Sequence, residues 1–425
     1  MILLLRGPAW RRDIWARTSR YYGGSMRIRW WIGRTLFAVT ALLLVIEMVV
    51  IHNLARINSA QYTRIQRLSQ PFQMQVTLDT LQRLRREALS RAALYDNLIQ
   101  RDMLLDGMVI HRGANGDPEG VCDSLMFSSL RFYALTKLGF KKSADEAWSR
   151  ILGSRDGSQW LRHPKCAKSL SRDMIMGVLV ALSADPEGGD AVFRSMLAEI
   201  DRNGGFVGDG PFYVSWLSPG VAGLLRMEAE RRGVPYGEWP WILKQSFLSI
   251  EYDAMFLGEG YVSHLAALGL WLEMNHTKSG ALMNPRSLLG RVERIVAGGA
   301  DLDTTLDKQR REWISGRLRS LSGSNLFFEW LDESATGVLN PEAESRLLSD
   351  LLSMPQFPSN RLPRDCDRDA DYIWQRREGE SIPVAKRCGE TWSGVDFLWM
   401  AAVLGAWSDD TKDNVETRPL IPLAH

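Results

Sequence analysis

The stretch "KSLSRDMIMGVLVALS" (residues 168–183) contains a segment, from Met174 to Leu182, that is apolar on every side. A helix without a polar face is expected to be buried all round, in the core of a large domain. The segment nevertheless opens with Arg172 and Asp173, two charges that need partners if they are buried. Ser171 is of a residue type that caps helix N-termini. We therefore predict a buried helix that begins near Ser171 and carries a pair of charges at its start.

The same theme recurs along the chain: a loop rich in Gly, Pro and Ser, then an apolar helix, then a more charged helix. The apolar segments are "CDSLMFSSLRFYAL" (122–135), "LSRDMIMGVLVAL" (170–182), "LSPGVAGLLRM" (217–227), "VSHLAALGLWLEM" (262–274), "SGSNLFFEWL" (322–331) and "WSGVDFLWMAAVL" (392–404). Each has a serine near its start, predicted as an N-cap: Ser124, Ser171, Ser218, Ser263, Ser322 and Ser393. The first separations between these serines, 47, 47 and 45 residues, are typical of a helix-pair array.

The segments between the apolar helices, such as "KSADEAWSRIL" (142–152), "GDAVFRSMLAEIDRNG" (189–204) and "SLLGRVERIVAGG" (287–299), are amphipathic. We expect an all-α domain over residues 85–410, with the apolar helices as an inner ring and the amphipathic helices around them. This arrangement resembles the (α/α)6 toroid of many glycoside hydrolases and polysaccharide lyases. The resemblance is architectural and matches no family motif. An open helical solenoid is the alternative, because periodicity alone does not close a ring.

A membrane anchor is predicted near the N-terminus, where the apolar run "TLFAVTALLLVIEMVVI" (35–51) follows a block of arginines and Trp30-Trp31. We expect residues 1–34 to be a basic cytoplasmic flank and residues 35–52 a single-pass signal anchor. A helical stalk (53–84) would then lead to the main domain, and residues 411–425 would form a polar tail. A cleaved signal peptide and a start at Met26 are the alternatives. The main domain is thus expected in the periplasm or outside the cell, attached to the inner (cytoplasmic) membrane.

The charge is distributed unevenly along the chain, which has 52 basic and 50 acidic side chains. Residues 1–52 hold eight arginines against Asp13 and Glu47, which leaves 44 basic and 48 acidic side chains in residues 53–425. A nucleic-acid partner is therefore not expected, because the main domain lacks the basic balance of nucleic-acid binders.

Four cysteines, Cys122, Cys166, Cys366 and Cys388, all fall in the part expected to be exported. An even number of cysteines in an oxidising compartment favours disulfides. The pairing of neighbours in the sequence is Cys122–Cys166 and Cys366–Cys388, and two other pairings remain open. No C-x-x-C spacing occurs, so no metal is expected; a zinc site and unpaired buried thiols are the alternatives. The sequence contains no nucleotide-binding motif, and no cofactor is expected.

Candidate catalytic residues lie where the inner helices begin, because the starts of all inner helices meet at one end of a closed ring. Asp123, Asp173 and Asp209 are the candidate carboxylates, and His264 is a candidate acid or base. Paired carboxylates cleave glycosidic bonds as acid plus base or nucleophile. The alternative for Asp123 and Asp173 is favourable interaction with a helix dipole, and for Asp209, between two glycines, a turn. For His264 the alternative is a core histidine.

Candidate substrate-binding residues share the same loops and are mostly aromatic, as suits the faces of sugar rings. They are Arg172, Trp160, Tyr213, Trp216, Tyr261, Trp330 and Asp396. Core packing is the alternative for the aromatic residues. Arg172 would orient a carboxylate or bind an acidic sugar.

The expected function is therefore that of a membrane-anchored, exported glycoside hydrolase that acts on a cell-envelope or extracellular polysaccharide or oligosaccharide. A polysaccharide lyase, with His264 or Tyr213 as the base, is one alternative. The other is a non-catalytic scaffold of a cell-envelope assembly, with protein partners. These alternatives stay open because function belongs to sites and not to folds.

Overall fold

The computed structural model describes residues 78–113, 115–157, 159–166, 170–207, 215–236, 261–278, 300–321, 325–335, 339–354 and 393–405. The chain divides into two compact units, Met1–Gln73 and Met74–His425, and every described residue belongs to the second. The predicted flank, anchor and polar tail lie outside the described residues. Among the helices that the structure describes, none combines the length and hydropathy that crossing a membrane requires.

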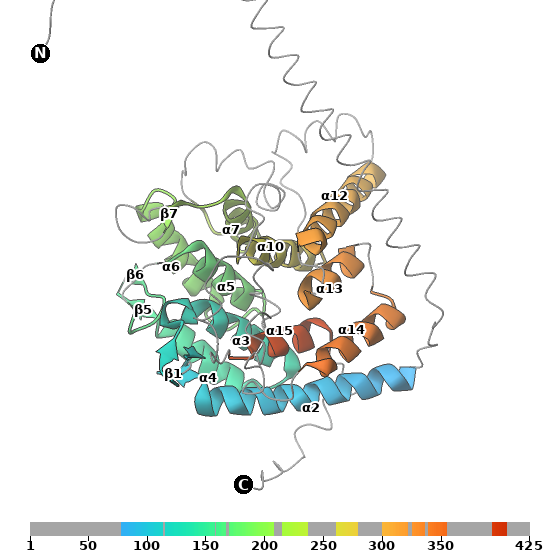
Figure 1. The fold of residues 1–425 in the computed structure, drawn as a ribbon. Helices are drawn as coiled ribbons and strands as arrows, with labels where there is room; N and C mark the ends of the chain where they lie inside the picture. The colour runs from blue at the N-terminus through green and yellow to red at the C-terminus, as the bar shows by residue number, and fades with distance from the viewer. Residues whose placement is uncertain are drawn as a thin grey trace, which may run out of the picture. The chain divides into compact units, whose positions relative to one another are not determined.

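The described part of the chain is mostly helical, which confirms the all-α prediction (Figure 1). The helices are α2 (Leu78–Asp102), α3 (Ser124–Leu138), α4 (Lys141–Leu152), α5 (Arg172–Leu182), α6 (Gly189–Arg202), α7 (Pro219–Arg231), α10 (Tyr261–Lys278), α12 (Ala300–Leu321), α13 (Leu326–Ala335), α14 (Pro341–Ser353) and α15 (Val395–Val403), with the 3-10 helix η1 (Val121–Asp123). The short strands pair as antiparallel hairpins: β1 (Leu104–Leu105) with β2 (Met108–Val109), β3 (His111–Arg112) with β4 (Pro118–Glu119), β5 (Arg155–Asp156) with β6 (Gln159–Trp160), and β7 (Phe206–Val207) with β8 (Ser215–Trp216).

Each of the predicted apolar segments contains a helix: α3, α5, α7, α10, α13 and α15. Every residue of α5 from Met174 to Leu182 is buried, as the absence of a polar face predicts. The helices between them are amphipathic. In α4, for example, the buried residues Ala144, Ala147, Trp148 and Ile151 recur at helical spacing. The amphipathic segment predicted over residues 287–299 lies outside the described residues.

Serine capping accounts for only one of the helix starts that the structure describes. The Ser218 hydroxyl accepts a hydrogen bond from the backbone N–H of Val221 at 3.3 Å, which caps α7. The prediction is wrong elsewhere: Asn325 caps α13 instead of Ser322, and Gly394, with φ 78°, precedes α15. At α5, Ser171 occupies the N-cap position without a side-chain cap.

The apolar helices contact one another in sequence order. α3 contacts α5, α5 contacts α7, α7 contacts α10, and α10 contacts α13. Phe327 of α13 meets Trp399 of α15 edge to face, with ring centroids 5.7 Å apart. The last of these helices, α15, also packs against the first, α3.

Aromatic side chains fill the space between three of these helices. Tyr133 of α3 lies 4.9 Å from Trp271 of α10 and 5.3 Å from Trp399 of α15, centroid to centroid. Trp271 and Trp399 are 4.7 Å apart. Each of these rings is buried, so the interior here is packed core and not an open channel.

The first described helix, α2, lies against α14 and α15 and is joined to α3 by a buried ion pair (Figure 1). Arg131 of α3 donates to Asp96 of α2 at 2.8 Å, and each residue is 3% exposed. Gln100 donates to the other oxygen of Asp96 at 2.6 Å. Because α2 begins at Leu78 and buries Leu81, the packed domain includes residues that the sequence assigned to the stalk.

Candidate functional site

Helices α3 and α5 pack directly against each other. Gly177 of α5 faces Met126 of α3 so closely that a Cβ atom on Gly177 would lie 2.8 Å from the Cα atom of Met126. The missing side chain therefore permits the close approach of the two helices. Asp123 directly precedes α3, and Arg172 and Asp173 open α5. Helix packing thus brings the candidate residues of two separate loops together.

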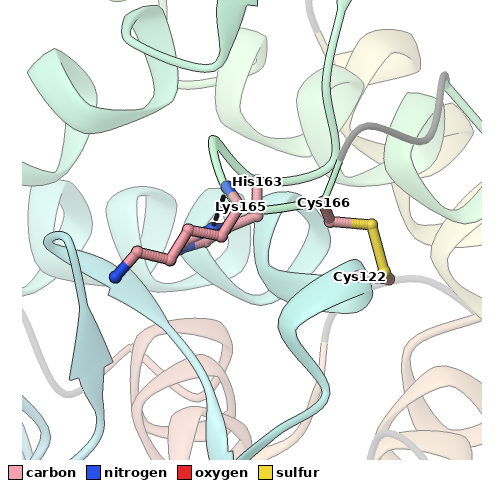
Figure 2. Close-up of a disulfide and its surroundings, with 4 residues drawn as sticks. All are labelled: Cys122, His163, Lys165 and Cys166. Carbon is pink, nitrogen blue, oxygen red and sulfur yellow. Dashed lines mark hydrogen bonds between the residues drawn. A yellow bond between two sulfur atoms is a disulfide. The ribbon is translucent and has the colours of Figure 1, made fainter.

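A disulfide between Cys122 and Cys166 crosses the same region and confirms the predicted pairing (Figure 2). The two Cα atoms are 5.5 Å apart, and the residues are separated by 44 positions in the sequence. The bond fixes η1, which contains Asp123, to the loop that leads to α5. In the chain-entropy treatment a loop of this length contributes about 4 kcal/mol to stability. The other predicted pair, Cys366 and Cys388, lies outside the described residues.

The pKa of Asp173 is raised, and the groups that shift this pKa show which charges meet at the site. Burial of the carboxylate is the largest cause, and the negative charge of Asp123 raises the pKa further. The positive charges of Arg172 and Arg162 oppose the shift, as does the backbone N–H of Asp173 itself. The site therefore contains two carboxylates in different environments, because Asp173 is half-buried and Asp123 is exposed. Their charges act on each other across the start of the two helices.

The loop of residues 160–166, here called the entrance loop, carries Arg162 into this site. The carbonyl oxygen of Arg162 accepts a hydrogen bond from Leu125 in the first turn of α3 at 3.1 Å. His163 is fully buried; its Nε2 lies 3.0 Å from the carbonyl oxygen of Leu105, and its Nδ1 accepts from the backbone N–H of Lys165 at 2.9 Å. Because Nδ1 is an acceptor, Nε2 carries the proton and donates. Figure 2 shows His163 and Lys165 beside the disulfide.

The start of the entrance loop, at Trp160, is held by the amphipathic helix α6. The carboxylate of Glu199 accepts from the backbone N–H of Trp160 at 2.5 Å and also from the backbone N–H of Leu170. The indole N–H of Trp160 donates to the Ser195 hydroxyl at 3.0 Å. Glu199 is 3% exposed, and this burial raises its pKa. One carboxylate thus fixes the chain where it enters the loop and where it leaves for α5.

Several predicted substrate-binding residues lie in the core instead. Trp160 is fully buried, which leaves neither face of its ring open to a sugar. Trp330 is 9% exposed, with Phe327 stacked at a centroid distance of 6.4 Å. Asp396 is buried in the first turn of α15. His264 is also fully buried, 5.1 Å from the ring of Phe328.

The remaining candidates cannot be placed at this site. Asp209 and Tyr213 lie outside the described residues. Trp216 belongs to β8, paired with Phe206, and Tyr261 begins α10, but their side chains are not among those the structure describes. Among the predicted site residues whose side chains the structure describes, Asp123, Asp173 and Arg172 are the ones brought together.

Sequence reasoning missed Glu199, although a signal was present. In α6, Val192, Met196 and Ile200 are buried at helical spacing, and Glu199 follows Val192 by seven positions on the same face. A carboxylate at an apolar position of an amphipathic helix indicates a buried acceptor with a specific donor. An amphipathic pattern alone predicts that the charges of this helix lie on its solvent face.

No protein-family model and no curated protein sequence matches this chain. The assignment of a function therefore rests on the geometry and electrostatics of the site.

Proposed function

We propose that this protein is an exported, membrane-anchored glycoside hydrolase whose acid and second carboxylate are Asp173 and Asp123. The raised pKa of Asp173, next to a second carboxylate, is the observation that carries the proposal. Glycosidases need one carboxyl group that stays protonated and one that is ionised, and different environments for the two provide this difference. Burial favours the protonated form of Asp173, whereas Asp123 is exposed to solvent.

In this reaction the carboxyl of Asp173 gives its proton to the oxygen of the scissile glycosidic bond as the bond to the anomeric carbon breaks. Asp123 either attacks the anomeric carbon or takes a proton from the attacking water. Water supplies the hydroxyl of the new reducing end, and its remaining proton restores Asp173 or is carried by Asp123. Arg172 and Arg162 balance the charge of the carboxylates and bind acidic groups of the substrate.

The fold that we propose around this site is a closed (α/α)6 ring. The contacts that run from α3 through α5, α7, α10 and α13, together with the packing of α15 against both α13 and α3, support closure over an open solenoid. The disulfide supports an oxidising compartment, in accord with export and with an anchor at residues 35–52.

The test is a screen of the purified full-length protein in detergent on cell-wall and extracellular polysaccharides, with Asp173→Asn as the variant. Removal of a general acid is expected to lower the rate by about 100-fold or more. Asp145→Asn, which changes an exposed carboxylate on α4, is the matched control and should keep full activity. Equal activity of wild type and Asp173→Asn would remove Asp173 from the mechanism.

A second candidate function, a scaffold of a cell-envelope assembly, is favoured by the packed aromatic interior of Tyr133, Trp271, Phe327 and Trp399. It predicts no hydrolysis of any polysaccharide and stable association with envelope proteins. A lyase that uses His264 as its base has less support, because that side chain is fully buried.

A further inference from the structure

Glu199 occupies a position that core packing alone does not explain. It lies on the buried face of α6, where an apolar side chain would avoid the cost of removing a carboxylate from water. Burial raises its pKa, while the N–H groups of Trp160 and Leu170 and the charge of Arg202 lower it. Its interactions are thus directed at the backbone of one loop.

The entrance loop between these contacts is attached to the site at two points. The disulfide joins Cys166 to Cys122, the residue before Asp123. The carbonyl oxygen of Arg162 accepts from Leu125, in the first turn of α3. A displacement of the loop would therefore move both Arg162 and η1 relative to the start of α5.

We propose that Glu199 is a positioning residue of the candidate site, which holds the entrance loop at Trp160 and Leu170 so that Arg162 and Asp123 stay in place beside Asp173. Only the reaction that these groups would perform depends on the proposed function. The positioning itself concerns the arrangement of the loop and can be measured without a substrate. Glu199 touches no reacting group and acts only through the loop.

The test is Glu199→Gln in the full-length protein. Glutamine keeps the size of the side chain but presents an NH₂ group to one of the two backbone donors, so the loop loses a hydrogen bond at one end. The control is Glu228→Gln on α7, because Glu228 is another buried carboxylate and is bonded to Arg231 and Arg232. Both variants remove one buried charge, but only the first releases the loop.

Two measurements report on the arrangement of the site. The first is the protonation of Asp173 as a function of pH, measured by esterification of the protonated carboxyl with a diazo ester and quantified by peptide mass spectrometry. The second is the rate at which a thiol reductant opens Cys122–Cys166. If the loop moves away and carries η1 with it, Asp173 loses the charge effect of Asp123 as well as the smaller, opposing one of Arg162, and its midpoint falls. The reduction rate is expected to rise about tenfold.

The second readout separates positioning from a direct charge effect. Neutralising Glu199 in an unchanged structure also lowers the midpoint of Asp173, but it leaves the rate of disulfide reduction unchanged. A lower midpoint and faster reduction in Glu199→Gln, with both unchanged in Glu228→Gln, support the proposal. An unchanged reduction rate in Glu199→Gln, or equal changes in both variants, overturns it.

A milder variant keeps the test decisive if Glu199→Gln does not fold. Ser195→Ala removes the hydroxyl that accepts from the indole N–H of Trp160, and it is expected to change both readouts in the same direction by a smaller amount. No change in Ser195→Ala would then count against the proposal. If these readouts respond but no polysaccharide is cleaved, the positioning stands and the proposed hydrolase function fails.

Discussion

Asp123 and Asp173 lie close enough together for the charge of one to raise the pKa of the other. The two residues occupy corresponding places in successive helix pairs, because Asp123 precedes α3 and Asp173 lies in the first turn of α5. Their proximity follows from the repeat itself, which places helix starts side by side. A like-charged pair at such a place destabilises the fold when both groups are ionised.

Asp173→Asn should therefore stabilise the domain at neutral pH. The pKa of Asp173 is raised in the folded state, so the folded protein holds this proton at pH values where the unfolded chain has lost it. Ionisation of Asp173 thus lowers the free energy of unfolding as pH rises through the folded pKa, and the penalty disappears below the unfolded value of about 3.9. Urea unfolding should show the advantage of the variant at neutral pH and its loss in acid. A variant less stable than wild type at neutral pH would mean that pairing with Arg172 or Arg162 outweighs burial.

Loss of the disulfide should destabilise the domain by about 4 kcal/mol in the chain-entropy treatment. The double variant Cys122→Ser, Cys166→Ser removes the constraint on the unfolded chain that joins residues 44 positions apart. Urea midpoints of the double variant and of reduced wild type should agree. If the double variant is as stable as the oxidised protein, the bond does not constrain the unfolded chain.

The buried pair of Asp96 and Arg131 predicts a strongly non-additive response. Asp96→Leu leaves Arg131 buried without its carboxylate and is expected to cost about 3–5 kcal/mol. Asp96→Leu combined with Arg131→Met removes both charges and should recover much of this loss. Denaturant unfolding of the two single variants and the double variant gives the coupling energy. Additive effects would show that the two residues do not act as a pair.

Gly177→Ala should force α3 and α5 apart. The added Cβ would lie 2.8 Å from the Met126 backbone, which cannot move as a flexible side chain does. Overpacking of this kind is expected to cost about 1–3 kcal/mol. Gly189→Ala, at the start of α6, is the matched control, because its added Cβ meets the ends of Leu182 and Arg232 at 3.2 and 3.4 Å. Thermal unfolding of both variants makes the comparison, and equal stability would contradict the close approach of α3 and α5.

The helices that carry the site could be predicted from the sequence because their burial leaves a direct pattern. Residues 174–182 have no polar face, and no arrangement other than burial on all sides suits such a helix. The pairing of Cys122 with Cys166 was one of three possibilities, and the packing of helix starts decides among them. Asp123, Asp173 and Arg172 came together for the same reason.

The predictions that were wrong depend on contacts between residues that are distant in the sequence. Trp160 resembles a loop aromatic, but its ring binds Ser195 on α6, and nothing local to residues 155–166 indicates this. Serine at a helix start is compatible with a cap but does not require one, as Ser171 shows. The acceptor that fixes the entrance loop, Glu199, lies on α6, which follows the loop only after the whole of α5.

The bond between Cys122 and Cys166 also determines how the molecule responds to mechanical load. A force applied to the two chain ends passes through the sulfur atoms, so the 44-residue stretch between them cannot be drawn out. Roughly 150 Å of contour length is thereby withheld from extension. The first helical hairpin, α3 with α4, lies inside this closed covalent loop and would remain compact while the later helices unravel.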